Sequence, residues 1–184
     1  MRIPKLVVAA FVAVNLLLVA ASVFALRQNV TLRNEINYDQ ALLTPRNGTV
    51  VPPLVGQDWQ GAQQTIEYGH DRRPTLVYTF SKDCAYCQKN WRAMRTLQAL
   101  APGRLRIIYI DAVRDLFTFK YLAENGIGQS QLLVQLPLSS EFVYGARAVP
   151  QLLLVDRDGL VQWSHVGELG RDDVSKVLSL IEHD

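Results

Sequence analysis

The longest apolar stretch of the chain lies near its start. Leu6–Leu26 contains no charged residue and only two clearly polar ones. A helix of this length rises about 30 Å, which is enough to cross the hydrocarbon core of a bilayer. We therefore expect a single transmembrane anchor at 6–26, with residues 1–5 in the cytoplasm because Arg2 and Lys5 precede the helix.

A cleaved signal peptide is the alternative interpretation of this stretch. Val23-Phe24-Ala25 is a tolerable cleavage site, but the apolar region of a signal peptide usually spans only about 7–15 residues. Either interpretation exports everything after residue 26. Residues 27–48 are polar and end in Thr44-Pro45-Arg46-Asn47-Gly48, so we expect a tether there.

Short apolar runs of strand length recur between Val50 and Val166. Thr75–Phe80 and Leu105–Ile110 are aliphatic, β-branched and aromatic, as expected for buried strands. A hairpin is predicted where Leu152–Val155 and Leu160–Val166 flank Asp156-Arg157-Asp158-Gly159. Weaker signals are an irregular edge segment at Val50–Leu54, a strand at Thr65–Tyr68 and a short apolar segment at Gln131–Leu136.

Helical periodicity separates these runs. Cys84 opens a helix that Pro102-Gly103 ends, a second is expected at Asp115–Asn125, and a third is capped by Asp172 or Asp173. The first helix repeats apolar residues every three positions, at Trp91, Met94, Leu97 and Leu100. The third has its inward positions at Val174, Val177, Leu178 and Ile181. This order predicts an α/β domain at 49–184, with a mixed central sheet and helices on both faces.

Charge excludes one class of partner. Outside Arg2 and Lys5, basic and acidic residues number 17 each, and no basic tract is present. Proteins that bind nucleic acid concentrate positive charge on one surface. We therefore expect no nucleic-acid partner.

The two cysteines of the chain, Cys84 and Cys87, are three residues apart. A zinc site needs about four ligands, and the three histidines lie at spacings that form no ligand pair, so no metal site is expected. A structural disulfide across so short a loop would constrain little of the unfolded chain. A copper site made of the cysteine pair and one distant histidine stays open as an alternative.

Thiol–disulfide exchange explains the surroundings of the pair. A buried strand delivers Cys84 to a helix start, where backbone amides and the helix dipole favour its thiolate. Cys87 lies one turn further in and is expected to be less accessible. We therefore expect Cys84 to attack a partner disulfide and Cys87 to resolve the mixed disulfide. Export places the pair in a compartment where thiols are not automatically kept reduced.

Two segments resemble the signatures of thioredoxin-like proteins. Tyr78–Cys87 is similar to their strand and active-site turn. Tyr144–Pro150, followed by Leu152–Gly159 with its Asp-Gly turn, is similar to their second signature. The resemblance covers about Gly48 to Ile181. Together with the N-terminal anchor, it points to the membrane-tethered TlpA-like group, which includes thioredoxins of cytochrome c maturation.

The resemblance implies a thioredoxin-like fold and further site residues. In that family the proline at the position of Pro150 is cis and packs beside the cysteines, which would leave the backbone of Val149 free to pair with an extended substrate. A glycine, here Gly167 or Gly170, follows the hairpin. Tyr86, between the cysteines, is either an exposed docking aromatic or a side chain that covers the sulfurs.

Three positions depart from the family pattern. Asp83 stands where a tryptophan usually precedes the first cysteine, and Gln151 where a threonine often follows the proline. Tyr78 stands where thioredoxins bury an acid, so the usual proton acceptor for the resolving thiol is missing. Asp83 would raise the pKa of Cys84 and Lys82 would lower it, so the residues leave the direction of electron flow open.

These features predict an exported thiol–disulfide oxidoreductase, tethered by a single-pass anchor to the inner membrane with its domain in the periplasm. The resemblance favours a reductant of exported protein disulfides, recharged by a membrane thiol reductant, with no cofactor besides the Cys84–Cys87 disulfide. One alternative on the same fold is a peroxiredoxin-like peroxidase, for which Ser81 fits but Val77 replaces the expected proline. Another is a tethered copper or assembly chaperone without turnover.

Overall fold

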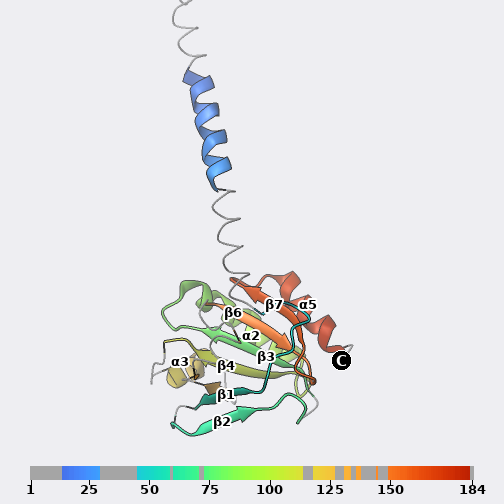
Figure 1. Ribbon diagram of the computed structural model, residues 1–184. Coiled ribbons are helices and arrows are strands. Elements are labelled where there is room, and N and C mark those ends of the chain that lie inside the picture. The colour runs from blue at the N-terminus through green and yellow to red at the C-terminus, as the bar shows by residue number, and fades with distance from the viewer. Residues whose placement is uncertain are drawn as a thin grey trace, which may run out of the picture. The chain divides into compact units, whose positions relative to one another are not determined.

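The computed structural model describes residues 14–29, 45–58, 60–70, 73–113, 118–126, 131–133, 136–137, 144 and 149–182. The chain forms two compact units, Met1–Asp39 and Gln40–Asp184. In the first unit, residues 14–29 form the helix drawn in blue in Figure 1. Within the described segments, no helix is both long and apolar enough to span a membrane. Residues 6–13 of the expected anchor and 30–44 of the expected tether lie outside those segments.

A five-stranded mixed sheet forms the centre of the second unit (Figure 1). Its order is β5-β4-β3-β6-β7. The strands are β3 (Thr75–Phe80), β4 (Arg106–Asp111), β5 (Gln131–Leu133), β6 (Gln151–Val155) and β7 (Val161–Val166). β3, β4 and β5 run parallel, whereas β6 is antiparallel to both β3 and β7. The predicted mixed sheet and its C-terminal hairpin are confirmed.

The two strands before the sheet differ from the prediction. β1 (Leu54–Gln57) and β2 (Gln63–Ile66) pair with each other as an antiparallel hairpin, so β1 begins where an irregular edge was expected to end, and β2 lies two residues before the expected strand. The turn between them fixes this register, because the Asp58 carboxylate accepts the amides of Gln60 and Ala62 at 2.9 Å each. Apolarity alone does not reveal the register, since only Ile66 of β2 is buried.

The helices are α2 (Ala85–Leu100), α3 (Thr118–Glu124) and α5 (Arg171–Glu182). All three contribute side chains to one core, which they share with Tyr78 and Phe80 of β3. On the opposite face, the β1–β2 hairpin packs with Leu136 and Tyr144 against the sheet. Helices were expected on both faces of the sheet. In the described segments the three helices of this unit cover one face, and apolar residues of the β1–β2 hairpin cover the other.

Two details of the helices also differ from the prediction. The Leu100 side chain of α2 is 53% exposed, whereas Trp91, Met94 and Leu97 are buried. A spacing of three residues is shorter than the helical repeat of about 3.6, so by Leu100 the apolar positions have moved off the buried face. α5 begins at Arg171, so Asp172 and Asp173 lie inside its first turn and not before it. Asp173 still caps the helix, because its Oδ2 accepts the Gly170 amide at 2.8 Å. The expected inward positions of α5 pack on the core.

Candidate active site

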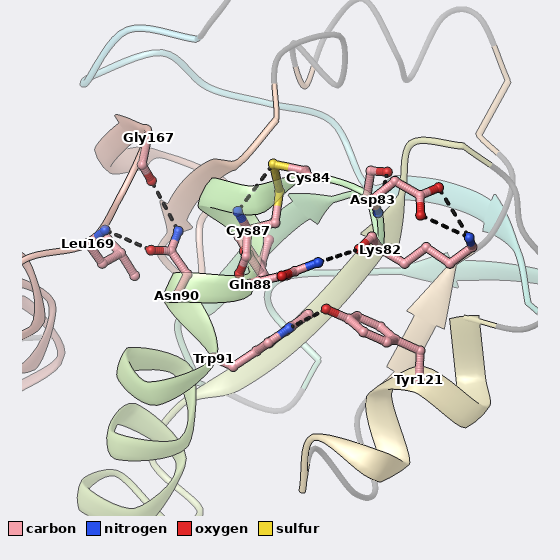
Figure 2. The surroundings of a disulfide bond; sticks show 12 residues. Lys82, Asp83, Cys84, Cys87, Gln88, Asn90, Trp91, Tyr121, Gly167 and Leu169 are labelled. Carbon is pink, nitrogen blue, oxygen red and sulfur yellow. Dashed lines mark hydrogen bonds and ion pairs between the residues drawn. A yellow bond between two sulfur atoms is a disulfide. The ribbon is translucent and has the colours of Figure 1, made fainter.

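A turn after β3 brings Cys84 to the start of α2. Cys84 is the N-cap residue, with extended backbone at φ −88° and ψ 111°. Its sulfur accepts a hydrogen bond from the Cys87 amide at 3.1 Å, and the two cysteines form a disulfide with their Cα atoms 5.2 Å apart (Figure 2). The sulfur therefore lies where a capping oxygen usually satisfies the free amides of a helix start.

The two sulfurs differ in accessibility. Cys84 is half-buried, whereas Cys87 is fully buried within the core that underlies the helix. In the reduced protein, the amides and dipole of α2 would stabilise a thiolate on Cys84, the residue that a partner can reach. The structure thus distinguishes an outer sulfur from an inner one.

The peptide bond between Val149 and Pro150 is cis, and it lies at the start of β6. The next residue, Gln151, pairs with Thr79 near the end of β3. Since β3 leads directly into the turn that carries Cys84, the register places the proline segment beside the same end of the sheet as the disulfide. Pro150 is buried and Val149 is partly buried against the core.

Lys82 and Asp83, which precede Cys84, form an ion pair with each other. The Lys82 ammonium lies 3.1 Å from both carboxylate oxygens of Asp83 (Figure 2). The Gln88 side chain also donates to the Lys82 carbonyl at 3.2 Å, which ties this turn to the first turns of α2. Two opposite charges therefore lie on the residues that directly precede Cys84.

No protein-family model and no curated protein matches the chain. Solved structures do. The thioredoxin domain of a thiol-disulfide oxidoreductase from Bacteroides vulgatus superposes with a TM-score of 0.60 at 20% identity, over 75% of this chain and 99% of that one. A putative thiol:disulfide interchange protein DsbE from Chlorobium tepidum gives 0.61 at 16%, over 76% and 98%. A thiol peroxidase from Chromobacterium violaceum gives 0.57 at 22%, over 76% and 88%.

The second unit has the thioredoxin-like fold. Its C-x-x-C disulfide lies at the helix start that follows the central strand, and solved structures that share this fold include thiol–disulfide oxidoreductases.

Within this thioredoxin-like fold, Tyr78 occupies the place where an acid was expected. Its hydroxyl is buried and donates to the Cys87 carbonyl at 3.2 Å. Burial raises the pKa of Tyr78 well above its ordinary value, although a hydrogen bond with the Asn90 side chain acts in the opposite direction. A phenol with a raised pKa stays protonated at neutral pH, so it holds the backbone of Cys87 in place and does not accept a proton from its thiol.

Asn90 is a site residue that the sequence analysis missed. Its side chain is fully buried on α2, yet both ends of its amide bond to the segment after β7. A polar residue next to Trp91, on the apolar face of the helix, was the available signal. Gly167 is the glycine of the family pattern that meets the proline, because its amide donates to the Pro150 carbonyl at 2.9 Å.

Tyr86 is 60% exposed and does not bury itself over the disulfide. The Lys89 ammonium lies 5.1 Å from the centre of its ring, within the range of a cation–π contact. Lys89 in turn bonds the Glu168 carboxylate at 2.9 Å. This leaves an exposed aromatic ring beside the outer cysteine, with an ion pair next to it.

Gln151, the remaining departure from the family pattern, is buried. Its amide donates to the Tyr144 carbonyl at 2.6 Å, on the side of the sheet away from α2. Across the described segments, no group of three or more His, Cys, Asp or Glu side chains is arranged to hold a metal ion.

Proposed function

We propose that the protein is an exported, membrane-tethered thiol–disulfide oxidoreductase that reduces disulfides in other exported proteins. The observation that carries the proposal is the asymmetric disulfide: Cys84 is partly accessible at the N-cap of α2, and Cys87 is buried one turn further on. The reductant direction, and membership of the TlpA-like group that includes cytochrome c maturation thioredoxins, rest on sequence resemblance.

The exchange proceeds in two steps. In the reduced protein, the Cys84 thiolate attacks one sulfur of the partner disulfide, forming a mixed disulfide and releasing the other partner sulfur as a thiolate. Cys87 then loses its proton and attacks the Cys84 sulfur, which restores the Cys84–Cys87 bond and releases the second partner thiolate. The partner gains two electrons and the protein loses two, so a membrane dithiol reductant must return them.

Three other groups have proposed roles in this reaction. The backbone beside Val149 and Pro150 would pair with an extended segment of the partner, and the exposed ring of Tyr86 would dock against it. Lys82 and Asp83 would set the thiolate fraction of Cys84 through their opposing charges.

The proposed location follows from the N-terminal apolar stretch. Leu6–Leu26 carries no charge and Arg2 and Lys5 precede it, which supports an inner-membrane anchor with the redox domain in the periplasm. Separating membranes from soluble extract, followed by protease treatment of spheroplasts, tests this part. A protein that stays protected from the protease would contradict it.

The exchange itself is tested by a trapping experiment. A Cys87→Ser variant cannot resolve the mixed disulfide, so Cys84 should remain covalently joined to partner proteins in exported extract. A Cys84→Ser variant is the matched control and should trap nothing. If neither variant gives disulfide-linked species, the exchange proposal fails.

The direction of electron flow is tested by the reduction potential of the full-length protein. A value near about −270 mV, as for thioredoxin, supports a reductant, and one near about −120 mV, as for DsbA, supports an oxidant.

The similarity to a thiol peroxidase structure supports peroxide reduction as a second candidate. Ser81 lies three residues before Cys84, as that chemistry requires, but Val77 occupies the position of the expected proline within fully buried β3. Peroxide consumption that depends on Cys84 would favour this function.

A further inference from the structure

Asn90 places an amide inside an otherwise apolar core. It lies on α2 one turn beyond Cys87, and its exposed fraction is 0%. Trp91 and Met94, its neighbours among the buried residues of α2, are both part of the apolar cluster. A buried amide without partners costs about 1–3 kcal/mol, so the bonds that Asn90 makes indicate what it holds in place.

Besides its hydrogen bond with Tyr78, Asn90 makes two bonds to the segment that follows β7. Its Nδ2 donates to the Gly167 carbonyl at 3.0 Å, and its Oδ1 accepts the Leu169 amide at 2.8 Å (Figure 2). The segment is 77 residues away in sequence from the helix that it meets. Gly167 has φ 112°, a conformation that favours glycine.

The same segment also reaches the proline. The Gly167 amide donates to the Pro150 carbonyl at 2.9 Å, while its carbonyl accepts from Asn90. A continuous chain of hydrogen bonds therefore runs from the helix that carries both cysteines, through Asn90 and Gly167, to the cis-proline segment. The same two parts are also connected by the pairing of β3 with β6 and by the packing of Val149 against the core that contains Cys87.

We propose that Asn90 is a positioning residue that holds the Val149–Pro150 edge at a fixed distance from the disulfide, and thereby favours polypeptide disulfides over small ones. This inference rests on the proposed exchange function. A polypeptide partner must engage the Cys84 sulfur and the backbone edge together, whereas a small disulfide needs only the sulfur. Movement of the edge therefore weakens the first reaction and spares the second.

The test compares two substrates in single-turnover reactions of the reduced, full-length protein in detergent. Insulin serves as the polypeptide disulfide and hydroxyethyl disulfide as the small one. Asn90→Leu should lower the second-order rate constant for insulin about tenfold, as expected when one or two hydrogen bonds are lost, and change the rate constant for hydroxyethyl disulfide less than about twofold.

Arg95→Met is the matched control. The Arg95 side chain also donates from α2 to a distant backbone carbonyl, that of Asn125 at 2.8 Å, but on the side of α3. This variant should leave the ratio of the two rate constants unchanged. A change in the ratio as large as that of Asn90→Leu would overturn the proposal.

Asn90→Leu leaves two buried backbone groups without partners, so Asn90→Ser is prepared alongside it. The shorter side chain leaves room for water to pair with those groups, and the same selective loss with insulin is expected. Equal losses with both substrates, no loss with either, or failure of both variants to fold would assign Asn90 a structural role only and overturn the proposal. A wild-type protein that reacts with neither substrate would instead contradict the proposed function.

Discussion

The hydroxyl of Tyr78 donates a hydrogen bond to the backbone carbonyl of Cys87, at 3.2 Å. This bond joins the central strand to the inner cysteine by a neutral group. Tyr78 stands where a thioredoxin-like protein was expected to carry an acid. In the exchange that we propose, its protonated phenol does not accept the proton of the inner thiol.

Tyr78→Phe should therefore destabilise the protein without abolishing exchange. Loss of the bond to Cys87 is expected to cost about 1 kcal/mol in the free energy of unfolding, measured by urea denaturation of the oxidised protein. The rate of exchange at pH 7 should stay within about twofold of the wild-type rate, because a phenol with a raised pKa is not the proton acceptor. A loss of ten-fold or more would show that the hydroxyl takes part in proton transfer.

Lys82 and Asp83 should affect the outer thiol in opposite directions. Lys82→Met leaves the Asp83 carboxylate unopposed, which should raise the pKa of the reduced Cys84 thiol. Asp83→Asn should lower it by a similar amount. The shifts are small because Asp83 is 72% exposed. The pH dependence of thiol alkylation measures both.

The double variant Lys82→Met with Asp83→Asn is the control for this pair. Its thiol should titrate close to that of the wild type, since both charges are gone. Shifts of the same sign in the two single variants would contradict the proposed balance of charges.

Gly159 should not tolerate a side chain. Its φ of 82° favours glycine, and an added Cβ would lie 2.9 Å from the Val51 carbonyl oxygen. Gly159→Ala is therefore expected to lower the free energy of unfolding by about 2 kcal/mol or more, because backbone strain and a clash with rigid backbone act together. Urea denaturation provides the measurement.

Gly61→Ala is the matched control for Gly159→Ala. Gly61 has φ 81°, but nothing lies within 4 Å of an added Cβ. It should show the cost of the backbone conformation alone, about 1 kcal/mol. Equal losses in the two variants would mean that the contact with Val51 contributes nothing.

Two buried tyrosines should make the protein sensitive to alkali. The Tyr144 hydroxyl donates to the Pro52 carbonyl, so the Tyr68 hydroxyl, 2.6 Å away, donates to Tyr144. Burial raises the pKa of Tyr144 to about 12, and burial together with the nearby Tyr144 raises that of Tyr68 further. Both therefore keep their protons in the folded protein at pH values where the unfolded chain, with a pKa near 10, has lost them.

The sign of the effect follows from this difference. The unfolded state binds fewer protons above about pH 10, so stability should fall as pH rises further, by up to about 1.4 kcal/mol per pH unit for each tyrosine. Below pH 10 the contribution should be constant. Urea denaturation between pH 8 and 11 measures the slope, and Tyr68→Phe should make it shallower. An unchanged slope in that variant would contradict the assignment.

The features that the sequence predicted well are local ones. The spacing of Cys84 and Cys87 after an apolar strand, and the Asp-Gly turn before Val161, both follow from residues close in sequence. In the turn, the Asp156 carboxylate accepts the amides of Asp158 and Leu160 at 2.9 and 2.8 Å, which is why such sequences form hairpins.

The features that it did not predict depend on distant partners. The sequence did not single out Asn90, because its partners lie 77 and 79 residues further along the chain. The hairpin of β1 and β2 was not predicted, and its second strand was expected two residues too late, for a related reason. Its register depends on a turn at Asp58, and most of β2 is not buried. The periodicity of apolar residues indicates which positions are buried. It does not indicate the hydrogen-bond partners of Asn90 or the register between β1 and β2.

The position of β3 in the sheet has a consequence for how the protein can be observed. All six of its residues are buried, and it pairs with β4 on one side and β6 on the other. Its backbone amides can therefore exchange with deuterated water only when the whole sheet opens. The rates of slow exchange along Thr75–Phe80 would therefore give the free energy of global unfolding. These amides lie a few residues from Cys84, so the stabilities of the oxidised and reduced proteins can be compared without a reagent that modifies either cysteine.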